Sequence, residues 1–169
     1  MPLRIFLIIL FIQPIFLFAQ EIQPTQNLLV TGKVKLEKTF SINQIKALRT
    51  IDLGEVNTSC SSKKRENAKG VKAVLLKDVL DSVRFQYDSP RLLNQFYFRF
   101  EASDGYTVVY SFNEIYNTET GNHLFIVVEK DGKPMEEMEN RILLLTTSDL
   151  KSGTRNIKNL ARIVVCKAE

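Results

Sequence analysis

The strongest constraint on the fold lies between residues 96 and 112, where apolar and polar side chains alternate on both sides of Asp104-Gly105. An Asp-Gly pair between two alternating runs is typical of a tight β-hairpin turn. The apolar positions are Phe96, Phe98, Phe100, Ala102, Tyr106, Val108, Tyr110 and Phe112. Because strand side chains alternate between faces, this aromatic stripe predicts the buried face of a sheet and the centre of the core.

Shorter elements are predicted on both sides of this hairpin. Apolar alternation and short apolar runs predict strands over residues 28–36, 51–56, 124–129, 141–147 and 163–165. Helical spacing predicts short helices over 40–49 and 76–83 and a helical turn over 157–161. Two capping boxes are expected, Ser41 with Gln44 and Ser111 with Glu114. The polar segment 57–69 is predicted to be a loop, and the whole pattern indicates an α+β fold with mixed or antiparallel β-sheets and short helices.

The first residues have the layout of a secretory signal peptide. Arg4 supplies a positive charge, an apolar run follows over 5–18, and Ala19 precedes a polar stretch. The apolar run contains Pro14 and is about 14 residues long, whereas a membrane-spanning helix needs about 20. A cleaved export signal is therefore expected, and no stable membrane span after cleavage.

The domain boundaries follow from this layout. Residues 1–19 are expected to be the signal peptide, 20–27 a polar linker and 28–169 a single domain, exported to the periplasm or secreted. An uncleaved anchor stays open, because Leu17 is larger than the residue usual at its place before a cleavage site. Without residues 1–19 the net charge falls from +4 to +3, because Arg4 is lost, which is too small to indicate a nucleic-acid partner.

Few residues of the chain carry catalytic chemistry. His123 is the single histidine and stands in a polar segment, where a solvated side chain is the usual outcome. No zinc-protease, nucleophile-elbow, Walker or dinucleotide-binding string occurs. The acidic group Glu136, Glu137 and Glu139 is interpreted as a solvated face. The basic segment 63–77 is interpreted as a solvated loop with weak potential for phosphate.

The two cysteines, Cys60 and Cys166, allow two interpretations. In an oxidising compartment they favour a structural disulfide, which would close a loop of about 106 residues and stabilise by about 4–5 kcal/mol. Alternatively, Cys60 is a metal or cofactor ligand. The two interpretations exclude each other, because only a free thiolate can be a ligand.

Six segments, in order, resemble the oxidoreductase molybdopterin-binding domain family, the central domain of sulfite oxidase and its bacterial relatives. They are residues 29–34, 40–48, 70–80, 102–106, 129–135 and 156–163, and the similarity extends over about 28–165. Among them are a "DGY" string at 104–106 and a "DGKPM" string at 131–135. The resemblance implies a sulfite-oxidase-like molybdopterin-domain fold in a short, stand-alone exported member.

The resemblance also implies a cofactor site. Cys60 lies near the place of the family's molybdenum ligand, and Arg155 and Lys158 would face the pterin phosphate. However, Ser-Ser-Lys-Lys-Arg follows Cys60 in place of the family's C-x-G-N string, and the chain has no tryptophan.

Two functions follow. The favoured one is a binding or interaction module on this fold without bound cofactor, with a Cys60–Cys166 disulfide. The alternative is a periplasmic molybdopterin-dependent oxidoreductase domain that uses Cys60 as molybdenum ligand.

Overall fold

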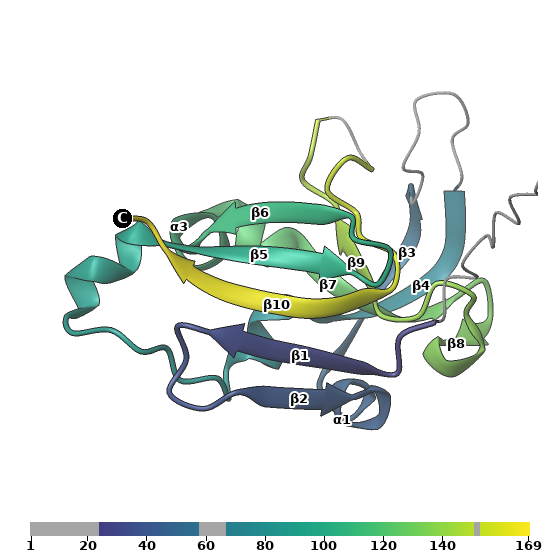
Figure 1. Cartoon of the computed structure of the whole chain (residues 1–169). Coiled ribbons are helices and arrows are strands. Elements are labelled where there is room, and N and C mark those ends of the chain that lie inside the picture. The colour runs from purple at the N-terminus through teal and green to yellow at the C-terminus, as the bar shows by residue number, and fades with distance from the viewer. Residues whose placement is uncertain (1–23, 58–66, 151–152) are drawn as a thin grey trace, which may run out of the picture.

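A computed structural model describes residues 24–57, 67–150 and 153–169 and contains two five-stranded sheets (Figure 1). The first sheet has the order β2-β1-β10-β5-β6. Its strands are β1 (Asn27–Gly32), β2 (Lys38–Ser41), β5 (Phe96–Ala102), β6 (Thr107–Ser111) and β10 (Leu160–Lys167). Strands β1 and β10 run parallel and all other neighbours are antiparallel, so the two ends of the domain meet at the centre of this sheet.

The second sheet is antiparallel throughout and lies behind the first in the view of Figure 1. Its strands are β3 (Thr50–Asn57), β4 (Asn67–Leu75), β7 (Leu124–Lys130), β8 (Lys133–Pro134) and β9 (Leu143–Thr146). Strand β4 pairs with β3 and β7, and both β8 and β9 pair with the other edge of β7. The expected α+β class with one mixed and one antiparallel sheet is therefore confirmed.

Short helical segments lie between the strands. They are α1 (Ile42–Lys46), α2 (Leu76–Leu80), α3 (Phe112–Tyr116) and the 3₁₀ helices η1 (Pro90–Gln95), η2 (Glu119–His123) and η3 (Met135–Glu137). Of these, η3 joins β8 to β9 within the second sheet, and the others lie in connections between the two sheets. Both predicted capping boxes are present, at Ser41 before α1 and Ser111 before α3. No helix within the described ranges is long and apolar enough to cross a membrane.

The aromatic stripe lies in a single apolar core to which both sheets contribute. Phe98 and Phe100 on β5 and Tyr110 on β6 are fully buried, as the alternation predicts. The Phe100 and Tyr110 rings meet edge to face with centroids 5.4 Å apart. Tyr106 is the exception in the stripe: it is 47% exposed, because it belongs to the turn and precedes the first residue of β6.

Three local predictions are wrong. The strand expected over 28–36 ends at Gly32, where φ is 91° and a Cβ atom would lie 2.3 Å from the Val165 carbonyl oxygen. Strand β4 begins at Asn67, inside the segment expected to be a loop. Residues 157–161 contain no helical turn: Ile157 forms an isolated bridge with Leu144, and Asn159 has a φ of 53°, which a right-handed helix does not allow.

Candidate functional site

The connection between β9 and β10 carries both Arg155 and Lys158. It is held to the first sheet by the Tyr106 hydroxyl, which donates to the Thr154 carbonyl at 2.5 Å. It is held to the second sheet by the Thr146 backbone N–H, which donates to the Asn156 side-chain oxygen at 2.9 Å. Side chains of the connection therefore lie at the junction between the tip of the β5–β6 hairpin and the end of β9.

Arg155 is fully engaged by neighbouring groups. Its Nε donates to Asp149 Oδ2 at 2.9 Å, its Nη2 donates to Asp149 Oδ1, and its Nη1 donates to Glu114 Oε1 at 3.0 Å. The guanidinium also lies 4.4 Å from the centre of the Tyr110 ring, a cation–π contact. Hydrogen bonding to Asp149 raises the pKa of the Arg155 guanidinium above its usual range. Arg155 is thus a permanent cation that two carboxylates neutralise.

Polar atoms are buried beneath this ion-pair cluster. Tyr110 Oη, Thr146 Oγ1 and Asn156 Nδ2 are inaccessible to solvent. The Tyr110 and Thr146 hydroxyls interact with each other, whereas Asn156 Nδ2 has no hydrogen-bond partner within the described part of the chain. Burial raises the pKa of the Tyr110 hydroxyl well above its usual value. An unpartnered buried polar group costs about 1–3 kcal/mol, so the Asn156 N–H₂ is a local destabilising feature of this cluster.

Lys158 lies in a different setting, beside a hollow of about 250 Å³. The hollow is lined by Asp104, Tyr106, Gly153, Asn156 and Lys158. Lys158 is exposed, whereas Asn156 is 1% exposed. One oxygen of Asp104 accepts the Tyr106 backbone N–H at 2.9 Å, which fixes that carboxylate in its own turn. An ammonium group and a free amide N–H₂ together favour a small oxyanion.

Of the two cysteines, Cys166 lies within the described ranges. Cys60 lies outside the described ranges, so its predicted ligand role stays a prediction. Cys166 is half-buried on β10, opposite Tyr97 of β5, and carries a free thiol. The expected disulfide therefore finds no support.

The remaining polar candidates lie on the surface. His123 is exposed, with Nδ1 3.1 Å from the Thr147 hydroxyl. Glu136 forms an ion pair with Lys46 at 2.5 Å, and this contact lowers the pKa of Glu136. In the described portion of the basic segment, Lys72 pairs with Glu129 at 2.9 Å. No three His, Cys, Asp or Glu side chains converge on a metal-binding point in the described ranges.

Sequence reasoning missed Asn156 and Asp149 as members of the site. Both are ordinary polar residues of an irregular segment, with no spacing that predicts burial. Asp149 is placed by its hydrogen bonds with Arg155, and Asn156 by its hydrogen bond with Thr146 at the end of β9. The resemblance placed Arg155 and Lys158 in one group, and the structure puts both in the same connection with different neighbours.

The fold resembles that of a solved sulfane dehydrogenase structure. Among solved structures, the chain is similar to the sulfane dehydrogenase SoxCD from Paracoccus pantotrophus, with a TM-score of 0.57 and 11% sequence identity. The similarity covers 82% of this chain and 37% of the other, so the chain spans little more than a third of that protein's length. No protein-family model matches the sequence, and no curated protein matches it either.

Proposed function

We propose that this chain is an exported binding module built on a sulfite-oxidase-like fold, and that it acts without bound molybdopterin. The observation that carries the proposal is the engagement of Arg155 by Asp149 and Glu114. The family resemblance implies a phosphate-binding role for this arginine. A phosphate at the Arg155 guanidinium would meet two carboxylates that already occupy its donors.

A ligand that binds the Arg155 guanidinium has to displace its carboxylate partners. The Arg155–Asp149 pair is bidentate, which is a strong geometry for an arginine and a carboxylate. The Asp149 side chain is 11% exposed, so removing its partner leaves a charge with little access to water. A cofactor phosphate would have to break this pair and would also be repelled by Glu114. The residues around Arg155 therefore do not fit the phosphate of molybdopterin.

The Lys158 hollow supports the binding half of the proposal. Its ammonium is exposed, and the buried Asn156 amide beside it has an unpartnered N–H₂. A small oxyanion would satisfy the amide and pair with the lysine. The ligand class proposed for this module is therefore a small phosphate- or carboxylate-bearing molecule.

Titration with inorganic phosphate, followed by NMR of backbone amides, tests the binding site. Saturable shifts are expected at Gly153, Asn156 and Lys158, and Lys158→Gln should weaken binding severalfold. Lys35→Gln is the matched control, because it removes the same charge at an exposed position outside the hollow. Equal weakening in both variants, or no saturable shift, would contradict the site.

Export is proposed from the layout of residues 1–19, which lie outside the described ranges. The mature chain should begin at Gln20 or Glu21. Intact-mass measurement on protein recovered from the periplasm or medium checks this expectation. A full-length mass recovered from membranes would overturn it.

The alternative is a molybdopterin-dependent oxidoreductase domain with Cys60 as metal ligand. The fold similarity to sulfane dehydrogenase SoxCD favours it. The similarity extends to the fold alone at this level of identity, and function resides in sites rather than in folds. Molybdenum analysis separates the two functions.

A further inference from the structure

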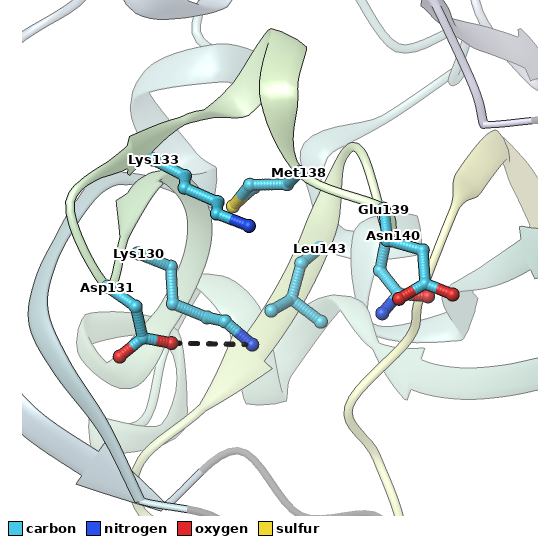
Figure 2. A pocket seen from close by; sticks show the side chains of 7 residues that line it. All are labelled: Lys130, Asp131, Lys133, Met138, Glu139, Asn140 and Leu143. Atoms are coloured by element: carbon cyan, nitrogen blue, oxygen red, sulfur yellow. Dashed lines mark ion pairs between the residues drawn. The ribbon is translucent and has the colours of Figure 1, made fainter.

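A second hollow, of about 220 Å³, lies at the opposite end of β7 from η2, between the β7–β8 turn and the segment that enters β9 (Figure 2). Lys130 and Lys133 line it from the hairpin, and Glu139 and Asn140 line it from the incoming segment. Met138 and Leu143 supply its apolar surface. This hollow shares no residue with the Lys158 hollow, so an inference about it does not depend on the proposed function.

The hairpin side is positively charged. Figure 2 shows the ammonium groups of Lys130 and Lys133 on the same side of the hollow, both directed toward Leu143. The Lys130 ammonium lies 4.0 Å from Asp131 Oδ2, a long and weak ion pair. The other oxygen of Asp131 accepts the Lys69 backbone N–H at 2.8 Å. Within the described ranges the Lys133 ammonium has no hydrogen-bond or ion-pair partner, so this side is ready to receive an anionic group.

The opposite side offers acceptors. Figure 2 shows the Glu139 carboxylate and the Asn140 amide across Leu143 from the two lysines. Neither side chain makes a hydrogen bond or ion pair with another described residue. Met138 and Leu143, between the two sides, are 6% and 3% exposed. Opposite charges thus face one another across an apolar strip without pairing directly.

The backbone beside Glu139 and Asn140 contains a strained residue that its contacts hold in place. Ile142, immediately before β9, is fully buried and has a φ of 51°, a rare conformation for a β-branched residue. Such a conformation costs about 1–3 kcal/mol and persists only where surrounding contacts hold it. The Arg141 and Ile142 carbonyls accept hydrogen bonds at 3.0 Å, from the Thr25 hydroxyl and the Leu160 N–H. The segment carrying Glu139 and Asn140 is therefore anchored at a defined place opposite the hairpin.

We propose that this hollow binds a small aliphatic zwitterion of the ω-amino carboxylate type. Its carboxylate would lie between Lys130 and Lys133, and its ammonium would meet Glu139 and Asn140. The methylene chain would cover Met138 and Leu143. A simple anion fits less well because Glu139 faces it, and a simple cation fits less well because two lysines face it.

Three probes of equal chain length test the charge arrangement on the full chain: 6-aminohexanoate, hexanoate and hexylammonium. NMR titration should give saturable shifts at Asp131 and Asn140 with 6-aminohexanoate. Each singly charged probe should bind about two- to fivefold more weakly, the range expected when one exposed charged contact is lost. Equal affinity for hexanoate and 6-aminohexanoate, or no saturable shift with any probe, would overturn the proposal.

Two variants assign the two ends of the ligand. Glu139→Gln should remove the preference for 6-aminohexanoate over hexanoate while hexanoate binding is retained. Lys133→Gln should reduce the preference for 6-aminohexanoate over hexylammonium. Glu137→Gln is the matched control, because Glu137 is exposed in the neighbouring η3 and does not line the hollow. Preferences that change equally in Glu139→Gln and Glu137→Gln would contradict the assignment.

Discussion

Arg155 and Lys158 stand in one connection, yet their surroundings are opposite. Arg155 is held by Asp149 and Glu114 above the buried Tyr110 ring, so it is joined to the core of the first sheet. Lys158 is exposed beside a hollow that Asn156 also lines, and the side-chain N–H₂ of Asn156 has no hydrogen-bond partner among the described residues. The first cation is neutralised by two carboxylates, and the second is the one that we propose to pair with a ligand.

The difference shows that charge and sequence position do not define a binding residue by themselves. What matters is whether a cation already has partners that a ligand would have to displace. Bidentate pairing to a poorly exposed carboxylate makes displacement costly for Arg155. Binding a ligand costs the exposed Lys158 ammonium little free energy, because ion pairs at exposed positions contribute little, whether they form or break.

The largest change in the free energy of unfolding is expected from the aromatic side chains that lie beneath Arg155. Phe100→Ala removes the ring that meets Tyr110 edge to face and should lower the free energy of unfolding by about 3–5 kcal/mol. Urea unfolding measures this loss. Val109→Ala, on the same hairpin at a 51% exposed position, should change stability by about 0.5 kcal/mol or less. A loss under about 1 kcal/mol for Phe100→Ala would mean that the stripe is not the core.

The next largest effect is the difference in stability between Arg155→Gln and Lys158→Gln. Arg155→Gln leaves Asp149 without its partner and should cost about 1–3 kcal/mol, below the range for fully buried pairs because Arg155 is partly exposed. Lys158→Gln should change stability by about 0.5 kcal/mol or less. Arg155→Lys should recover part of the loss at most, since lysine cannot form the bidentate pair. Equal losses in the two glutamine variants would remove the distinction between the cations.

The smallest effect at neutral pH is expected from Tyr110→Phe. The Tyr110 hydroxyl is buried and interacts with the Thr146 hydroxyl, a single neutral contact, so its removal should change stability at pH 7 by about 1 kcal/mol or less. Burial raises the pKa of Tyr110 above the unfolded value of about 10. The stabilisation from keeping this group neutral is complete below pH 10 and is lost as the pH rises above it.

Unfolding experiments between pH 8 and pH 11 test this sign. Wild type should lose stability above about pH 10, and Tyr110→Phe should lose less. Burial also raises the pKa of Tyr116, so part of the alkaline loss should persist in the variant. Tyr87→Phe, at a 43% exposed position, is the control and should follow wild type. An alkaline loss that is unchanged in Tyr110→Phe would contradict the burial of its hydroxyl.

The sequence predicts the parts of the fold that local spacing determines. The 96–112 hairpin and the two capping boxes follow from neighbours within a few residues, and the structure confirms them. Strand β2 was not predicted, because it is a four-residue edge strand with little alternation. Strand β4 starts in a polar stretch because pairing with β3 and β7, distant in sequence, sets its extent.

The candidate site was predictable only as a segment. The resemblance led to Arg155 and Lys158, but it gave neither Asp149 in the same connection nor the neighbours on β6, α3 and the β5–β6 turn. The sequence did not predict the hollow that Lys130 and Glu139 line, because Glu139 has the same local sequence pattern as the solvated Glu137. Tertiary contacts make the difference between these side chains.

Molybdenum content tests the central claim most directly. Wild type and Cys60→Ser should be purified from a molybdate-fed host that makes molybdopterin, and the metal should be measured together with free thiols under denaturing conditions. We predict no molybdenum above the level of Cys60→Ser, with thiols that are either paired in a Cys60–Cys166 disulfide or both free. Stoichiometric molybdenum in wild type that disappears in Cys60→Ser would contradict the account and establish the oxidoreductase.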